Sequence, residues 1–323
     1  MSQSTMAGAI ATIVGWVTLT AIAATPTDSS HTPSGNSGNA VVSGNGHCIA
    51  FVSEADDLVA DCHNGPITDV FVRDLDRGET VLISRAVGGR DGGNRSSRAP
   101  SISADGRWVA FESAATNLVE GDGNDRVDVF LHDRTTGLTR RVSARAGGQV
   151  GSDLEPGDSR NPALTADGQW IFFDSENALV TDDTNGQRDV YRYRVSTGDL
   201  DWVSRASGEP NPVAVDSMVP VVDPTVRWLA YRRLPLDAPR GIPTEGTDLM
   251  ILDLKSGTGG YLKSPIQGNA DQYRFSADGR TLVAGLATSG RKHVVVSFDL
   301  ESGSTTLVDA GSAAAGRVSL NSL

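Results

Sequence analysis

Short apolar runs, each only a few residues long, follow one another along most of this chain. In the clearest stretch they cover residues 99–103, 108–112, 127–132 and 139–143. These runs are rich in Val, Ile, Phe and Trp, and each is too short for a helix, so we expect β-strands. The pattern therefore predicts four short strands joined by turns as the local unit of an all-β chain.

The four-strand unit recurs along the chain. Three copies of its first half align readily at residues 41–51, 101–111 and 163–173, and two weaker copies lie at 222–231 and 275–285. The second half begins in each copy at Asp69, Asp128, Asp189, Asp248 and His293. Positions 48, 108, 170, 228 and 281 are equivalent, so the steps are 60, 62, 58 and 53 residues. Self-similarity of this kind is the signature of a repeat architecture.

Glycines mark the turns inside each unit. The turn between the first two strands ends on Ala-Asp-Gly in three copies, at Gly106, Gly168 and Gly279. Glycine supplies a positive φ there, and aspartate bonds to its own backbone. The turn between the last two strands ends on Gly78, Gly137, Gly198, Gly257 and Gly303. We interpret these positions as structural.

Four-stranded units repeated radially, with their edges hidden between neighbours, predict a β-propeller of four-stranded antiparallel blades rather than a solenoid. The motif Ser-Ala-Asp-Gly-Arg-Trp-Val-Ala-Phe at 103–111 is followed by Asp-Val-Phe-Leu-His-Asp at 128–133. Together they resemble the PD40 (WD40-like) repeat of TolB-like propellers, with Ala where that family usually has Pro. The resemblance covers residues 39–309 and implies a ring that commonly has six blades. Five repeats are detected and six are possible; residues 310–323 are interpreted as a tail or a closing strand.

The connections predicted at one face of the propeller are much longer than those at the other. Blade-to-blade segments 85–98, 144–160 and 205–216, and segments 113–126 and 175–188 within blades, all fall on that face. Connections this long are uncommon unless they are functional or mobile, and binding loops on a rigid scaffold are a usual arrangement. The candidate binding residues are Arg90, Asp91, Arg95, Asp153, Glu155, Asp158 and Arg160. Solvated connections without a ligand are the alternative.

Two of these loops share a spacing of oxygen-bearing residues. Asp122, Asn124 and Asp128 repeat as Asp183, Asn185 and Asp189. Oxygens at positions 1, 3 and 7 are similar to a calcium-binding loop, although positions 5 and 12 lack ligands. Turn capping through backbone hydrogen bonds explains the same residues. Calcium is therefore the one cofactor that the sequence suggests, and it competes with a purely structural interpretation.

The charge balance argues against nucleic acid as a partner. The 323 residues include 28 Lys and Arg against 40 Asp and Glu, a net charge of −12, which a phosphate backbone would repel. The only cysteines are Cys48 and Cys62. The repeat places them at opposite ends of a strand, roughly 20 Å apart, whereas a disulfide tolerates about 6 Å between Cα atoms. We expect free thiols unless the loop folds back.

The N-terminus predicts export. Residues 6–24 carry no charge and end in Ala21-Ile22-Ala23-Ala24, small residues suited to signal peptidase. Segment 1–24 is interpreted as a signal peptide, or as an uncleaved membrane anchor because the preceding residues lack Lys and Arg, and 25–38 as a linker. The expected location is periplasmic or secreted.

No catalytic motif is recognisable in the sequence. The five histidines are scattered, and neither a zinc signature nor a Gly-x-Ser-x-Gly nucleophile motif is present. The sequence favours a non-enzymatic propeller that holds a protein or a cell-envelope polymer on its long-loop face. The alternative is a propeller enzyme of lyase or glycosidase type, with an acidic site at the mouth of the central tunnel.

Overall fold

The computed structural model describes residues 34–60, 65–145, 156–205, 215–235, 247–288 and 293–308. Every regular element within them is a β-strand. The first two blades consist of β1 (Ser37–Val42), β2 (Cys48–Ser53), β3 (Asp69–Asp74), β4 (Glu79–Leu82), β5 (Ser97–Ile102), β6 (Trp108–Ser113), β7 (Asp128–Asp133) and β8 (Leu138–Arg141). The other three consist of β9 (Ser159–Leu164), β10 (Trp170–Ser175), β11 (Asp189–Arg194), β12 (Leu200–Trp202), β13 (Val215–Val222), β14 (Trp228–Pro235), β15 (Leu249–Asp253), β16 (Gly259–Tyr261), β17 (Asn269–Phe275), β18 (Thr281–Ala287), β19 (His293–Asp299) and β20 (Ser304–Leu307).

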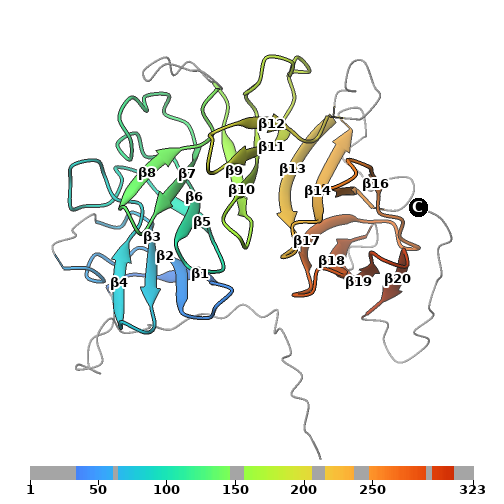
Figure 1. The fold of residues 1–323 in the computed structure, drawn as a ribbon, viewed down its shortest axis with the longest axis horizontal. Coiled ribbons are helices and arrows are strands. Elements are labelled where there is room, and N and C mark those ends of the chain that lie inside the picture. Colours follow the sequence, from blue (N-terminus) through green and yellow to red (C-terminus); the bar gives the residue numbers. More distant parts are fainter. Residues whose placement is uncertain are drawn as a thin grey trace, which may run out of the picture.

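The strands form five four-stranded antiparallel sheets, each in simple chain order. The first strand of each sheet lies near the centre of the molecule and the fourth lies at its outside (Figure 1). The prediction of an all-β propeller with five detected blades is therefore confirmed. The blades follow one another along an arc, and β1 of blade one and β17 of blade five stand on either side of an opening (Figure 1).

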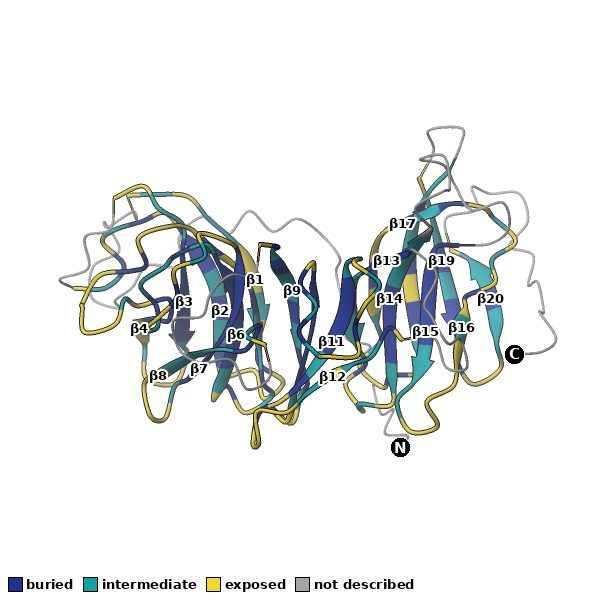
Figure 2. Cartoon of the chain, turned by 90° about the horizontal axis from the view of Figure 1, so that it is seen from above, coloured by how far each residue is buried: buried dark blue, intermediate teal, exposed yellow. Residues whose placement is uncertain are grey.

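Apolar contacts between neighbouring sheets make up the core. Val72 of blade one packs in one cluster with Phe111 of blade two, and Leu131 of blade two packs in the next with Tyr191 of blade three. Figure 2 shows the buried residues along the strands and the exposed residues in the turns at the sheet ends. The two middle strands of a blade bury both of their faces, as β6 and β7 do. Their sequences are therefore nearly continuous apolar runs rather than alternating ones.

A β-bulge with a strained backbone recurs in the innermost strand of four blades. Asn39, Ala99, Asn161 and Val219 occupy equivalent positions, and each has a φ between 48° and 57°. The strand register shifts at each of these sites. In three blades the next residue is proline, at 100, 162 and 220, which fits a bulge because proline has no N–H to donate.

The turns between first and second strands are built alike. In blade two, Ser103 Oγ donates to Asp105 Oδ1 (2.5 Å) and accepts from the N–H of Trp108 (3.0 Å). The turn of blade three lies against the previous blade: a Cβ on Gly168 would come within 2.7 Å of Trp108 Cδ1. Each blade from two to four has a half-buried tryptophan beside an inter-blade core, with an arginine over its ring: Trp108, Trp170 and Trp228.

Blade four breaks this turn pattern and leads to a first prediction. Gly46, Gly106, Gly168 and Gly279 have φ values between 69° and 77°, whereas the equivalent residue in blade four is Val226, at φ 58°. A β-branched side chain in this region costs about 1–2 kcal/mol. We expect Val226→Gly to raise the free energy of unfolding by about 1 kcal/mol, measured by urea denaturation. Val226→Ala should gain much less, and a loss of stability in Val226→Gly would contradict the argument.

Candidate functional site on the long-loop face

The two faces of the propeller differ in the length of their connections, as the sequence predicted. On one face the second and third strands are joined by residues 54–68, 114–127 and 176–188, and successive blades by 83–96, 142–158 and 203–214. On the opposite face the hairpin turns span only residues such as 103–107 and 134–137. The asymmetry fades in blade five, where residues 288–292 join the middle strands. We call the side with the long connections the long-loop face.

The long connections between blades one and two are ordered by contacts with each other. Asn94 Nδ2 donates to Thr116 Oγ1 and Asn94 Oδ1 accepts from the Thr116 N–H, both at 2.9 Å. The backbone N–H of Val87 donates to the carbonyl oxygen of Asn117 at 2.8 Å. These reciprocal bonds hold 83–96 against 114–127, so the two connections have a defined position relative to each other on this face.

An ion-pair network lies at the inner rim of this face, where blades two and three meet. Glu112, near the end of β6, accepts from Arg98 Nε at 2.9 Å and from the backbone N–H of Asn161 at 2.9 Å. Arg160 lies 3.8 Å from Glu112 and pairs with Asp158 at 2.7 Å. Glu112 is buried, and it binds directly to the bulge of the next blade. Glu112 therefore joins blades two and three.

The next blade repeats the arrangement with Asp174. Its carboxylate accepts from Asn161 Nδ2 (2.7 Å), from the bulge N–H of Val219 in blade four (2.9 Å) and from Arg188 Nη1 (2.5 Å). Arg188 also pairs with Glu176. Burial raises the pKa of the Asp174 carboxyl, and the bonds from Asn161, Val219 and Arg188 oppose that rise. Asp174 thus occupies the position equivalent to Glu112 and makes the same kind of joint.

A third carboxylate joins blades four and five. Asp248 accepts from the N–H of Ala270 in blade five and pairs with Arg232, each at 2.7 Å. Sequence reasoning did not single out Glu112, Asp174 or Asp248 as joints. The sequence feature that could have identified them is an acid at equivalent positions of β6 and β10, Glu112 and Asp174. In blade one this position is occupied by Val52.

A serine pair closes the long-loop end of three blades but not of the fourth. Ser37–Ser53, Ser97–Ser113 and Ser159–Ser175 each share a hydroxyl hydrogen bond of 2.9 Å across the first two strands. In blade four the paired residues are Ser217 and Arg233. Ser217 Oγ and Arg233 Nε are buried and have no hydrogen-bond partner among the residues that the structure describes. The two residues are direct cross-strand partners. Their hydroxyl and guanidinium N–H could donate to an anionic group, and unpaired buried donors are costly.

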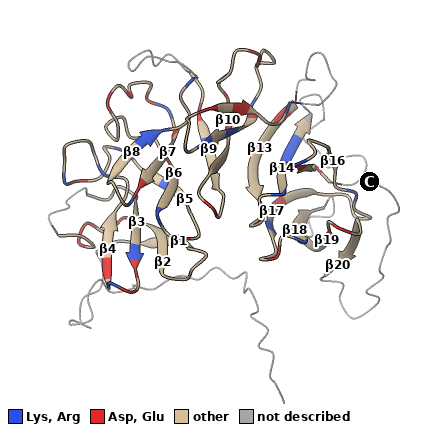
Figure 3. Ribbon diagram, viewed as in Figure 1, with Lys and Arg blue, Asp and Glu red and all other residues tan. Residues whose placement is uncertain are grey.

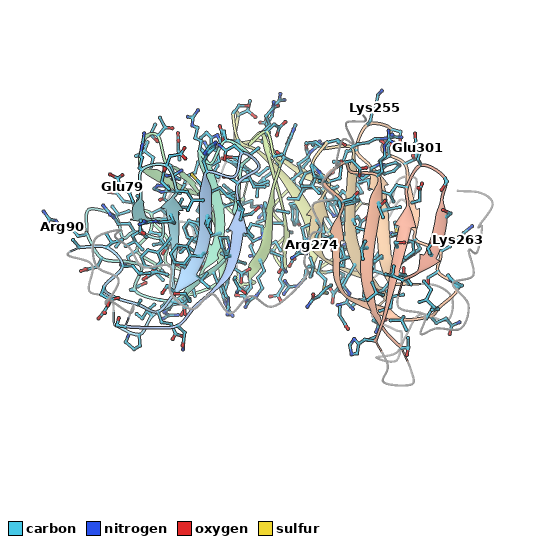
Figure 4. All side chains as sticks on the ribbon, turned by 90° about the horizontal axis from the view of Figure 1, so that it is seen from below. Glu79, Arg90, Lys255, Lys263, Arg274 and Glu301 are labelled. Atoms are coloured by element: carbon cyan, nitrogen blue, oxygen red, sulfur yellow. The ribbon has the colours of Figure 1, made fainter. Side chains whose placement is uncertain are left out.

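The predicted binding residues do not form one cluster. Arg90 and Asp91 are exposed, and Figure 4 places Arg90 at the outer edge of the molecule. Arg95 pairs with Asp125 at 2.9 Å, whereas Asp158 and Arg160 belong to the inner-rim network. Bonds from the Val127 N–H and from Arg160 lower the pKa of the Asp158 carboxyl against its burial. Asp153 and Glu155 lie outside the described residues.

The candidate calcium motif makes the bonds expected of a capped turn. Asn124 Nδ2 donates to Asp128 Oδ2 (3.0 Å), and Asn124 Oδ1 accepts from the N–H of Arg126 (2.9 Å). Asn185 and Asp189 repeat this arrangement, with 2.7 Å between Asn185 Nδ2 and Asp189 Oδ2. Asp128 Oδ1 further accepts from Ser143 Oγ at 2.6 Å. These bonds favour the capping interpretation.

Blades two and three differ in how they balance the charge of this motif. Arg141 lies 3.5 Å from Asp122 and 3.4 Å from Asp128, and a second cation would be repelled there. Blade three has Trp202 at the position of Arg141, and burial raises the pKa of Asp189. Calcium therefore stays a prediction, with blade three the better candidate. If the melting temperature were the same in added calcium as in chelator, the calcium prediction would be wrong.

Other candidate chemistry is sparse in the part of the chain that the structure describes. No group of three or more His, Cys, Asp or Glu residues there could hold a metal ion. Acidic and basic residues are interspersed over the blades (Figure 3). Cys48 is a buried free thiol that accepts from Arg134 Nη1 at 3.1 Å, and Cys62 lies outside the described residues. No helix among the described residues could span a membrane.

The fold of this chain is shared with proteins of known structure. No protein-family model matches the sequence, and no curated protein matches it. Solved structures do match, at low identity. A TolB from Acinetobacter baumannii is 16% identical over 86% of this chain and 55% of its own, with a TM-score of 0.51. A puromycin-hydrolyzing peptidase from Mycobacterium tuberculosis is 16% identical over 88% of this chain and 41% of its own, with a TM-score of 0.54.

The tricorn protease gives a similar match, 14% identical over 86% of this chain and 26% of its own, with a TM-score of 0.50. This chain thus spans about half the length of the TolB and less than half of the two peptidases. The fold is that of a TolB-like β-propeller. At these identities the structural similarity establishes the fold alone. The similar structures include both a TolB and peptidases.

Proposed function

We propose that this protein is an exported, non-enzymatic propeller that holds a protein or a cell-envelope polymer on its long-loop face. The observation that carries the proposal is the concentration of long, mutually bonded connections on one face. A rigid sheet scaffold with such loops at one end is a usual design for binding. Export rests on the apolar segment 6–24.

Within that face, the end of blade four is the best anchoring point. Within the described part of the chain, Ser217 Oγ and Arg233 Nε have no hydrogen-bond partner, in contrast to the serine pairs of blades one to three. An acidic group on the partner would satisfy both donors. Bonds from a charged group to buried donors contribute about 1.5–3 kcal/mol, so this point would add specificity to a larger contact surface.

The enzymatic alternative has one supporting observation, the raised pKa of the buried Asp174 carboxyl at the inner rim. Perturbed carboxyls are typical of active sites. Against it, Asp174 already accepts hydrogen bonds from Asn161, Val219 and Arg188. Glu112 is likewise paired with Arg98. A general acid must reach its substrate with a free proton or lone pair. We therefore rank binding above catalysis.

The proposal is tested by capture from a native cell envelope followed by mass spectrometry. Arg233→Ala and Arg90→Ala on the long-loop face should each reduce the captured partner about tenfold, which corresponds to about 1.4 kcal/mol. Lys255→Ala is the matched control, because its hairpin turn lies on the opposite face (Figure 4). Capture that is unchanged in both loop-face variants, or lost equally in the control, would overturn the proposal.

A further inference from the structure

The side of each blade that faces the next blade is covered, except in blade five. Equivalent positions of the second strand are fully buried in the first four blades: Ala50, Ala110, Phe172 and Ala230 are all 0% exposed. Blade five has Val283 at this position, and it is 39% exposed. Val308 of the same blade is 58% exposed, whereas Val142, which makes the equivalent backbone bond in blade two, is 1% exposed. We call this side of β18, β19 and β20 the blade-five face.

Blade one has the complementary face on the other side of the opening. Phe51 stacks on Phe71 with 5.7 Å between the ring centroids, and Phe111 stacks on Phe130 of blade two at the same distance. Phe111 is 0% exposed because blade one packs against it, whereas Phe51 is only half-buried. Val42, at the end of β1, is 59% exposed on the same side as Phe51. We call this side of β1 and β2 the blade-one face.

The two faces are the two halves of a blade-to-blade contact. Where two blades meet, a residue of the second strand packs in one apolar cluster with an aromatic residue of the next blade. These pairs are Ala50 with Phe111 and Ala110 with Phe173. Val283 of blade five and Phe51 of blade one occupy the same two positions, but the blades that carry them stand apart on either side of the opening (Figure 1).

We propose that the ring closes within one chain by packing of the blade-five face on the blade-one face, so that the propeller has an open and a closed state. Burial of the four exposed apolar residues stabilises the closed state, because removing apolar surface from water is favourable. A second copy could offer its blade-one face only together with its blades two to five. Those blades would need the space that this chain's own blades occupy (Figure 1). The inference concerns ring closure and is independent of the proposed binding function.

The joints on either side of blade four lack one restraint that the first two joints have. The N–H of Asn45 donates to the carbonyl of Ala104 at 2.9 Å, and the N–H of Ala104 donates to the carbonyl of Ala166 at 2.8 Å. These bonds join the inner turns of blades one, two and three. Among the described residues, no backbone bond joins the inner turn 223–227 of blade four to that of blade three, or 276–280 of blade five to that of blade four. Rotation at these two joints can narrow the opening while blades one to three stay together.

Paired cysteines in the full chain test the contact. A Cβ on Gly44 of blade one would lie 2.7 Å from the Cβ of Ala104, the residue at the same turn position in blade two, which is within reach of a disulfide. Ala277 holds this turn position in blade five. Closure should therefore let Gly44→Cys and Ala277→Cys form a disulfide within one chain after mild oxidation. The background carries Cys48→Ser and Cys62→Ser, and the crosslinked peptide is measured by mass spectrometry.

Two matched pairs calibrate the yield of this disulfide. Gly44→Cys with Ala104→Cys joins turns that already touch, and Ala104→Cys with Ala277→Cys joins blades that closure does not bring together. We expect the Gly44–Ala277 pair to crosslink within about twofold of the first control, because the same turn contact forms. A yield no higher than that of the second control would overturn the proposal, and so would a disulfide between two chains. If the first control fails, Asn45→Cys replaces Gly44→Cys in both pairs, since the Asn45 N–H already bonds to the Ala104 carbonyl.

A charge in the proposed contact provides the second readout. Val283→Asp should lower the yield of the Gly44–Ala277 pair several-fold, because closure would then bury an unpaired carboxylate. The yield of the Gly44–Ala104 pair should stay the same, since blade five takes no part in that contact. If Val283→Asp left the Gly44–Ala277 yield unchanged, the two faces would not be what holds the ring closed, and the proposal would be wrong.

Discussion

Replacing Asp174 with alanine should lower the free energy of unfolding by about 3–5 kcal/mol, the usual cost of breaking a buried ion pair on one side. The change removes the acceptor for Arg188, for the Asn161 amide and for the bulge N–H of Val219. Those groups lie where blades three and four meet, so their donors would stay buried and unpaired. Urea unfolding followed by tryptophan fluorescence measures the loss.

Two further variants separate charge from hydrogen bonding at this site. Asp174→Asn keeps the shape and an acceptor, and burial already raises the pKa of the carboxyl toward its neutral form. We therefore expect a much smaller loss than in Asp174→Ala. Asp201→Ala removes a half-exposed partner of Arg192 and should change stability by less than about 1 kcal/mol. If Asp174→Ala cost no more than Asp201→Ala, the joint between blades would have no structural importance.

Acid should destabilise the protein through His132, and the loss should begin at a higher pH than the usual titration of Asp and Glu. Burial lowers the pKa of His132 from 6.5 to about 4 in the folded chain. Well above pH 6.5 the histidine is neutral in both states and contributes no pH dependence. Between pH 6.5 and 4 the unfolded chain binds the proton first, so folding stability falls as the pH falls. The full loss corresponds to roughly 3 kcal/mol at 1.36 kcal/mol for each pKa unit.

The measurement is the free energy of unfolding between pH 7.5 and 4.5, compared with His132→Gln. Glutamine can replace the bond of 2.9 Å that the ring makes with Thr139 Oγ1, but it does not titrate. The unmodified protein should lose more stability over this range than His132→Gln does. Parallel pH profiles for the two proteins would show that His132 does not carry the effect.

The strands and blades could be predicted because each of the five repeats obeys the same physical constraints. Apolar runs such as 108–112 fit a buried strand, and glycines such as Gly106 and Gly137 fit turns that need a positive φ. The long-loop face followed from strand order alone, since antiparallel strands fix which connections share an end. Local chemistry was sufficient for each of these features.

The joints between blades could not be predicted in the same way. The Glu112 carboxylate meets the Asn161 N–H across 49 residues of sequence, and Asp174 meets Val219 across 45. Only the radial packing of sheets brings these groups together. For the same reason the sequence did not show that Arg160 and Asp158, predicted as binding residues of the long-loop face, belong to a network with Glu112, or that Arg90 lies at the outer edge (Figure 4).

The sequence by itself determined the strand unit, its five copies, the turn glycines and the face on which the long connections lie, because each depends on residues close together in the chain. The tertiary structure decided which acids join the blades and which hydroxyls are left unpaired, as at Ser217. It also decided that Val283 and Val308 remain exposed at the end of the arc. These outcomes depend on what the next sheet places against each side chain, and a repeat pattern carries no information about where the ring stops.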